Sequence, residues 1–425
     1  MLLEFSVANY LSFKERVVFS MLASNDDTLE ESNVFAIGKK RLLKSAVIYG
    51  ANASGKSNLL SAMLCMRRMV KESSKDSQAN EDIDVEFFKL NIECDDKPSF
   101  FEIVFNQNNC MYRYGFEADN KRIHSEWLFS IPRTKEVELF VRDGQQIKVN
   151  KSQFKEGLDL GTKTRENALF LSVCAQFNGA ISKELLLWFQ DFRFVHGLSD
   201  LGYLERTVDL LKDIKQKDKI MGMAHIADLS IENIEGVKRK LTLEDLPKNL
   251  SDDVKKEIVN TEIMQTEMKT LHKKYGINGE EVGTVKFDLN TDESGGTVKF
   301  LTMTGPLLDT LQDGTVLVVD ELDARLHPLL TQAIVKLFNS ITNSKNAQLI
   351  FVTHDVSLLT NQLFRRDQIW FTEKDTYGGT DLYSLSSLLK VRKTASFGKD
   401  YVLGKYGAIP FIGDTKLLYC EANNE

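Results

Sequence analysis

The sequence predicts an α/β fold with a mostly parallel sheet covered by helices, an antiparallel β-subdomain and a central helical insertion. An apolar run at residues 45–49 leads into a glycine-bounded loop and then into a helical pattern. Several strand-like segments, separated by short turn signals, follow one another between residues 99 and 143. In the last third of the chain, strand and helix patterns alternate, which is typical of a parallel sheet with covering helices.

The chain has 425 residues and a hydrophobic fraction of 42%, which fits one large domain with an insertion, or two domains. The formal net charge of -7 is unlike that of a free-standing nucleic-acid binder, although a local basic surface in an assembled dimer stays open. No apolar run reaches the roughly 18 residues that span a bilayer, and the first ten residues lack the basic region of a signal peptide. The five scattered cysteines indicate free thiols in a reducing compartment. We therefore expect a cytoplasmic protein without membrane contact.

The first half of the chain shows strand patterns on either side of a helix. Residues 2–7 and 16–21 alternate apolar and polar side chains and predict an N-terminal hairpin. The apolar run is followed by a helix from Lys56 to about Lys71, and further helical patterns lie between residues 164 and 192. The antiparallel strands expected in between are residues 99–106, 111–119, 124–131 and 137–143.

Residues 203 to about 280 are charged and poor in glycine, and they predict a helical insertion. Apolar residues in its second half recur near helical spacing and trace one face, which needs a partner surface. That partner is either the rest of the chain or a second subunit. The predicted face consists of Val254, Ile258, Ile263, Met264, Met268 and Leu271.

The last third returns to alternating strands and helices. The strand expected at 315–321 is apolar or β-branched from Thr315 to Val319, as a central parallel strand should be. The other expected strands are residues 283–289, 347–354, 368–373 and 380–385. The expected helices are the second half of residues 293–312, then 328–340 and 356–364.

Residues 50–57, Gly-Ala-Asn-Ala-Ser-Gly-Lys-Ser, fit the phosphate-loop pattern G-x-x-x-x-G-K-[ST] without a mismatch. Glycines at both ends let the backbone N–H groups converge on phosphate oxygens, and the following helix adds the positive end of its dipole. Lys56 should reach the β- and γ-phosphates, and Ser57 should bind Mg²⁺. The expected nucleotide-binding residues are Gly50, Asn52, Ala53, Ser54, Gly55, Lys56, Ser57 and Asn58.

Two carboxylates and a histidine stand at the ends of later strands. Asp320 and Glu321 follow the apolar strand at the edge where parallel sheets bind ligands. Asp320 is expected in the Mg²⁺ shell, and Glu321 is positioned to deprotonate the attacking water. His354 ends the next strand and can sense the γ-phosphate through a hydrogen bond.

A second anion site is predicted at residues 293–297, "ESGGT". Ser294, Gly295 and Gly296 lie just before a helix, whose dipole and free N–H groups attract an anion. One nucleotide does not need two phosphate-binding sites on one chain. The economical explanation is that this site contacts the γ-phosphate of a nucleotide bound to another copy.

The phosphate loop, the Ser-Gly-Gly segment, the acidic strand and the histidine, in this order, resemble the head of ABC-type ATPases. The chain is more similar to the SMC and recombination-repair branch, because "LLEFSVANYLSF" precedes the loop. It looks most like the OLD-like ATPases of prokaryotic antiviral systems, of the RloA/AbiLi abortive-infection type. The matching segments are "FSVANYLSFKE", "YGANASGKSNLL", "MYRYGFE", "NALFLSVCAQFN", "ESGGT", "VVDELDARLHP", "VTHD" and "KDYVLGKYGAIP".

The resemblance implies further roles. Gln176 would be the glutamine that links the helical lobe to Mg²⁺ and water. Asp323 would touch the opposite subunit, and Asn9 would lie near the nucleotide. Glu293 and Thr297 depart from the leucine and glutamine of transporter ATPases. The implied divisions are an N-terminal ATPase half at 1–200, the insertion at 201–282, a C-terminal ATPase half at 283–390 and a tail at 391–425.

The resemblance also implies a function. We expect binding of ATP and Mg²⁺, a homodimer or higher oligomer with composite ATP sites, and slow hydrolysis. About 40 residues follow the last ATPase strand, which is too short for the Toprim nuclease of the OLD proteins. The chain would then sense or scaffold in an anti-phage system that controls a separate effector, for example a nuclease. The alternatives are an SMC-like ATPase that clamps DNA and a non-catalytic scaffold locked by nucleotide.

Overall fold

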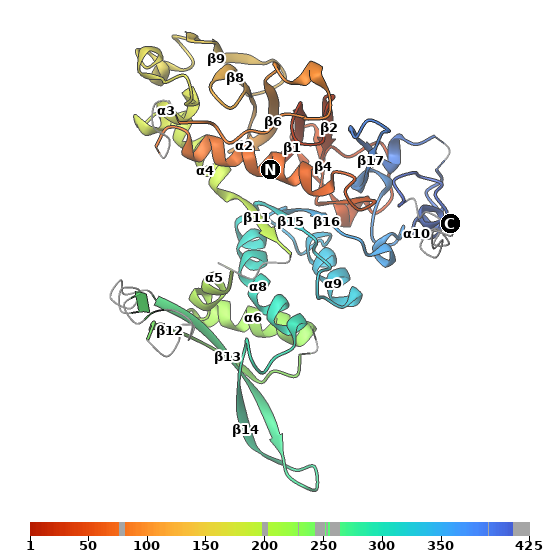
Figure 1. Ribbon diagram of the computed structural model, residues 1–425. Helices are drawn as coiled ribbons and strands as arrows, with labels where there is room; N and C mark the ends of the chain where they lie inside the picture. Colours follow the sequence, from red (N-terminus) through yellow and green to blue (C-terminus); the bar gives the residue numbers. More distant parts are fainter. Residues whose placement is uncertain are drawn as a thin grey trace, which may run out of the picture.

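The computed structural model of the chain is shown in Figure 1. It describes residues 1–75, 81–197, 203–227, 229–242, 251, 254–255, 264–389 and 391–410. A seven-stranded antiparallel sheet lies at one end of the molecule and a six-stranded sheet at its centre (Figure 1). A three-stranded sheet projects from the opposite end. The α/β class predicted from the sequence is confirmed.

The central sheet is parallel except for its last strand and has the order β11-β15-β16-β5-β17-β18. Its inner strands are apolar and fully buried, because helices or the second sheet cover both faces. β11 was not expected, since the predicted helical region ended at its first residue and no element was assigned to the other four. The strands are β5 (Ser45–Gly50), β11 (Phe192–His196), β15 (Val316–Asp320), β16 (Gln348–Val352), β17 (Ile369–Lys374) and β18 (Thr380–Ser384).

The antiparallel sheet has the order β10-β9-β8-β7-β6-β1-β2 and unites the predicted N-terminal hairpin with the four predicted strands. Two helices, α3 (Phe170–Gln176) and α4 (Ala180–Asp191), follow it in the chain. The strands are β1 (Leu2–Ala8), β2 (Val17–Ser20), β6 (Ser99–Gln107), β7 (Cys110–Ala118), β8 (Ile123–Ile131), β9 (Val137–Asp143) and β10 (Gln146–Val149). Beside the sheet lie α1 (Glu30–Asn33) and the hairpin β3 (Val34–Ile37) and β4 (Lys40–Leu43).

A buried carboxylate fixes α3 to this sheet. Glu126 on β8 accepts hydrogen bonds from the backbone N–H groups of Phe170 (2.6 Å) and Leu171 (3.0 Å) at the start of the helix. Arg142, also fully buried, lies 3.7 Å from the same carboxylate and donates to the carbonyl of Ala168. Both buried charges thus have hydrogen-bond partners besides each other, which offsets the cost of removing an ion pair from water.

Helix α2 (Lys56–Glu72) contacts strands of both large sheets, namely β1, β5 and β15. The buried residues of α2 form a wide stripe, because the helix packs against both large sheets. The other helices of the central sheet are α8 (Gly295–Asp313), α9 (Pro328–Phe338) and α10 (Phe397–Val402). Short 3-10 turns lie at Ile92–Cys94, Lys155–Gly157, Gly161–Lys163, Val356–Leu358, Arg366–Gln368 and Leu385–Ser387.

The insertion begins with helices, as expected, but continues as a sheet. Helices α5 (Tyr203–Leu210) and α6 (Ile214–Ile226) precede β12 (Asn233–Lys240), β13 (Met264–Tyr275) and β14 (Glu281–Asp288). Met264, Met268 and Leu271 therefore lie on a strand, and their predicted helical face is wrong. Ile258 and Ile263 lie outside the described residues, and Val254 is exposed. The apolar residues have helical spacing, but strand pairing with β12 and β14 places this segment in a sheet instead.

Two further expectations are wrong. The strand predicted at 283–289 belongs to the three-stranded sheet and not to the parallel one. The helix predicted at 356–364 is a 3-10 turn followed by irregular chain, whose Leu359, Leu363 and Phe364 are buried in the core. Tertiary packing of these side chains overrides their local helical pattern. Cys65, Cys94, Cys110 and Cys174 are free thiols, and Cys420 lies outside the described residues.

No helix in the described part of the chain is long and apolar enough to cross a membrane.

Candidate nucleotide-binding site

Four parallel strands bring their carboxyl ends to one edge of the central sheet. The strand pairing sets His196 beside Asp320, Val319 beside Phe351 and Val352 beside Ile48. Gly50, His196, Asp320 and His354 therefore lie at the same edge, where open α/β sheets bind ligands. His196 was not predicted, because the strand that carries it was missed.

The phosphate loop has the backbone that its sequence requires. Ala53 (φ 60°) and Gly55 (φ 106°) are left-handed, and a side chain at Gly55 would meet Thr380 Oγ1 at 2.4 Å. Lys56 Nζ donates to the carbonyls of Gly50 and Ala51, at 2.9 Å each, so the ammonium group lies over the loop. Burial lowers the pKa of Lys56, and the carboxylates at residues 320, 321 and 323 oppose this shift. One buried cation therefore lies close to three carboxylates at this edge of the sheet.

The N-terminal turn supports the loop from outside. Ser12 Oγ accepts from Asn58 Nδ2 (2.7 Å) and lies 2.8 Å from Thr380 Oγ1, which also donates to the carbonyl of Ser54. Ser54 Oγ lies 2.6 Å from Thr372 Oγ1 on β17. Ser12, Thr372 and Thr380 were missed, because their contacts join segments far apart in the sequence. Asn58 was expected to bind the nucleotide, but its side-chain amide donates to Ser12 in the N-terminal turn.

Asn9, also expected near the nucleotide, serves a different loop. Its side-chain nitrogen donates to the carbonyls of Cys94 and Lys97, and its oxygen accepts from the N–H of Phe88. With both ends of the amide bonded and the residue buried, Asn9 fixes the loop that precedes β6.

The structure brings Ser57 and Asp320 together across 263 positions of sequence. Ser57 Oγ donates to Asp320 Oδ1 at 3.2 Å. A hydroxyl and a carboxylate are the hard oxygen donors that Mg²⁺ prefers, and Mg²⁺ usually keeps several waters and phosphate oxygens as its other ligands. The pair fits Mg²⁺. Within the described residues, no group of three or more His, Cys, Asp or Glu could hold a metal by itself.

Glu321 and Asp323 follow Asp320 on a strained turn. Glu321 is left-handed (φ 51°), an unusual conformation for this residue type that is often found at functional sites. Asp323 Oδ2 accepts from the backbone N–H of His354 at 3.4 Å, while its Oδ1 is buried without a hydrogen-bond partner in the described part of the chain. Burial, reinforced by the charge of Lys56, lowers the pKa of His354. His354 is therefore a neutral imidazole at pH 7.

Gly197 packs directly against this turn. Its N–H donates to the carbonyl of Asp320 at 2.7 Å, and an added Cβ would lie 2.1 Å from the Glu321 carbonyl and 2.4 Å from that of Asp320. The fully buried Lys299 on α8 donates to the Gly197 carbonyl. The end of β11, the acidic turn and α8 are therefore held together.

The Ser-Gly-Gly segment forms the exposed start of α8. Ser294 is the N-cap, and its Oγ accepts from the N–H of Thr297 at 3.1 Å. Within the described residues, the side-chain hydrogen bonds of Ser294 go to Thr297 only. A side chain at Gly296 would come within 2.9 Å of the Arg325 carbonyl, on the loop after the acidic turn. The free N–H groups of a 19-residue helix thus face outward beside that loop.

The unusual Glu293 has a structural explanation. Its carboxylate accepts hydrogen bonds from His272 Nε2 (2.7 Å) and from Thr270 Oγ1, both on β13. The residue before Ser294 is therefore bonded to the three-stranded sheet of the insertion, a contact that a leucine could not make.

The structure does not bring Gln176 to this site. The residue is exposed at the C-terminal end of α3, which Figure 1 shows at the outer end of the antiparallel sheet, away from β15. The register partner of Asp320 is His196 instead. A glutamine near a helical pattern was too weak a signal to locate this position.

A phosphate loop at the end of a parallel strand, with a hydroxyl–carboxylate pair across the sheet edge, defines a P-loop nucleotide-binding protein. The family model described as "AAA domain, putative AbiEii toxin, Type IV TA system" matches residues 45–360. The chain belongs to this family of P-loop ATPases, whose members bind ATP.

Solved structures give a broader likeness. An Smc head bound to the C-winged helix domain of ScpA is 14% identical (TM-score 0.44; 90% of this chain and 97% of that chain covered). The SMC head domain of Thermotoga maritima is 12% identical (TM-score 0.40; 90% and 98%). The recombination mediator protein RecF is 15% identical (TM-score 0.33; 90% and 98%). The comparison with curated proteins gives no match.

Gly197→Ala should destabilise the protein, because the new Cβ collides with two backbone carbonyls that cannot move without disturbing the acidic turn. We expect a loss of about 1–3 kcal/mol, or a melting temperature lower by a few degrees, measured by thermal denaturation. The matched control is Gly222→Ala in α6, where the Cβ meets nothing within 4 Å. Equal melting temperatures for the two variants would contradict the close approach.

Proposed function

We propose that this chain binds ATP with Mg²⁺, pairs with a second copy around two ATP molecules and hydrolyses ATP slowly. The observation that carries the proposal is the exposed anion-attracting start of α8 on the same chain as an intact phosphate loop. Within the described residues, the Ser294 side chain bonds only to Thr297 in its own helix turn, which leaves this exposed turn available for a partner's nucleotide. In the proposed dimer, the nucleotide bound to the second copy presents its γ-phosphate to this site.

The residues divide the work as follows. The loop N–H groups and Lys56 bind the β- and γ-phosphates, and the partner's copy of residue 294 contacts the γ-phosphate from the other side. Ser57 and Asp320 would hold Mg²⁺, which neutralises phosphate charge when bound. Glu321 orients a water molecule and accepts its proton. The neutral His354 donates a hydrogen bond to the γ-phosphate, and Asp323 holds the backbone of His354 in place.

The family description supports a finer proposal, in which the ATPase senses or scaffolds in an anti-phage system and controls a separate effector. The alternative of an SMC-like DNA clamp gains no support from the insertion, whose described part is two helices and a three-stranded sheet rather than a long coiled coil.

Glu321→Gln should retain ATP binding and lose hydrolysis. Removing a general base costs about 10²–10⁴-fold in rate. Phosphate release and ATP affinity would be measured for both proteins, with Glu15→Gln, an exposed glutamate distant in sequence, as the control. If the wild type turns over no faster than Glu321→Gln, the chain is a nucleotide-locked scaffold and not an enzyme.

Ser294→Arg should leave ATP binding to the monomer largely intact and abolish hydrolysis, because the bulky cation blocks the partner's γ-phosphate. In a Glu321→Gln background, ATP should produce a dimer by light scattering, and adding Ser294→Arg should remove it. Asn290→Arg places the same charge on an exposed residue four positions earlier and should change neither property. Joint loss of ATP binding and hydrolysis in Ser294→Arg would show that the two motifs do not act between chains.

Lys56→Ala should abolish protection against phage in cells that carry the gene with its neighbours, because the loop loses its cation for the β- and γ-phosphates. Plaque counts would be compared with those of the wild type and of Lys71→Ala, a lysine on the last turn of the same helix. Protection equal to the wild type in Lys56→Ala would exclude nucleotide-dependent defence.

A further inference from the structure

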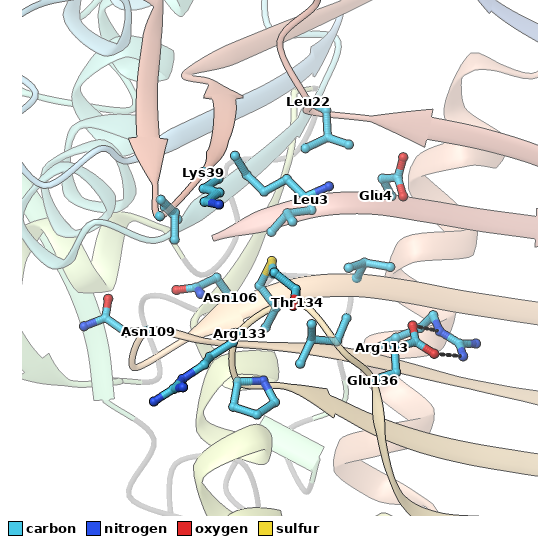
Figure 2. A pocket seen from close by; sticks show the side chains of 17 residues that line it. Leu3, Glu4, Leu22, Lys39, Asn106, Asn109, Arg113, Arg133, Thr134 and Glu136 are labelled. Carbon is cyan, nitrogen blue, oxygen red and sulfur yellow. Dashed lines mark hydrogen bonds and ion pairs between the residues drawn. The ribbon is translucent and has the colours of Figure 1, made fainter.

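A groove of about 1010 Å³ lies between the β3–β4 hairpin and one face of the antiparallel sheet (Figure 2). This face is opposite to the one that forms the main core of the sheet. A small apolar cluster, with buried Leu3, Phe35 and Leu42, lies beneath it. The groove is at the upper end of the size range of ligand pockets, about 300–1,000 Å³.

The floor of the groove is apolar. It is formed by Leu3, Leu22, Ile37, Val104, Met111 and Ile131, most of them only half-buried. Contiguous apolar surface of this kind marks interaction sites on soluble proteins. Burial also raises the pKa of Glu4 at its edge, and the nearby Lys40 opposes this rise.

The rim of the groove is basic. Lys39 lies in the β3–β4 turn and Arg133 in the segment after β8, across the groove from it in Figure 2. Lys40, the first residue of β4, also lines the groove. In the described part of the chain none of these three side chains forms an ion pair or a hydrogen bond. Arg113, in contrast, is bonded to Glu136 at 2.7 Å within the same groove. Three cations that form no ion pair or hydrogen bond within the described residues lie around one apolar floor, with Glu4 as the acid nearest to Lys40, on a chain of net charge -7.

We propose that this groove docks an acidic, amphipathic segment of a partner protein, with apolar side chains on the floor and carboxylates at Lys39, Lys40 and Arg133. The charge of the rim selects acidic over basic segments, and the floor selects amphipathic over purely polar ones. A nucleic acid backbone would meet the cations of the rim but would not bury the apolar residues of the floor. A flat membrane surface would not reach a floor that is recessed between a hairpin and a sheet. The site does not involve the phosphate loop, so the inference is independent of the proposed function.

The probe is a fluorescein-labelled 18-residue helical peptide with leucine on one face and glutamate on the other. Fluorescence anisotropy with the full chain should give micromolar binding that weakens with added salt. Two control peptides, one with lysine for glutamate and one with serine for leucine, should bind at least about tenfold more weakly. Hydrogen exchange of the wild type with the acidic peptide should slow at residues 37–40 and 131–134.

The decisive variant is Lys39→Glu combined with Lys40→Glu and Arg133→Glu. All three residues are exposed, so the fold and ATP binding should stay as in the wild type. Affinity for the acidic peptide should fall at least roughly tenfold, the sum of three modest charge contacts. The control reverses three exposed lysines elsewhere, Lys274, Lys345 and Lys399, and should change the affinity little. Val104→Glu, on the floor, should weaken binding without touching the rim.

Several outcomes would overturn the proposal. One is failure of the acidic peptide to bind at 100 μM or below, roughly the weakest affinity expected of such an interface. Another is equal affinity for the triple variant and the wild type, or equal binding of the lysine peptide. Cosedimentation of the wild type, but not the triple variant, with phosphatidylserine vesicles would assign the same cations to a lipid surface instead.

Discussion

The parallel pairing of β5 with β16, and of β16 with β15, is the constraint on which the rest of the site depends. It places Gly50 at the same sheet edge as Asp320 and His354, although more than 250 residues separate Gly50 from either of them. The hydrogen bond from Ser57 to Asp320 follows from this register and from the point where α2 begins. A slip of one residue in either pairing would turn Asp320 to the opposite face of the sheet.

Helix α2 transmits the constraint to the antiparallel sheet. Its first residue, Lys56, belongs to the phosphate loop, and its apolar residues contact strands of both sheets. The turn that follows β1 closes the arrangement, since Ser12 is joined to Thr380 on β18 and to Asn58 on α2. The loop is thus fixed by its own glycines, by a strand end and by a turn from the other sheet. Such fixed N–H groups can bind phosphate without reorganising first.

The sequence was sufficient for the parts of the fold that local patterns govern. Strands with clear alternation, the phosphate loop and the acidic turn lie where the residues indicate. Long-range pairing decides what was missed. Met268 and Leu271 keep helical spacing, yet β12 and β14 recruit their segment into a sheet. His196 reaches the site only because β11 pairs with β15. Gln176 and Asn9 have side chains that could act at a nucleotide site. A single sequence does not show that both residues fold away from that site.

The contact between Gly197 and Asp320 has an evolutionary consequence. The chain leaves the central sheet at Gly197, and α8 returns to the same point, because Lys299 Nζ donates to the Gly197 carbonyl. The insertion between these two residues therefore starts and ends at one place. Segments grafted between adjacent ends are well tolerated, and doubling their length costs only about 0.6 kcal/mol in closure entropy. We therefore expect the part of the chain ahead of α8 to tolerate changes in length and content without movement of Asp320 and the nucleotide-binding edge of the sheet.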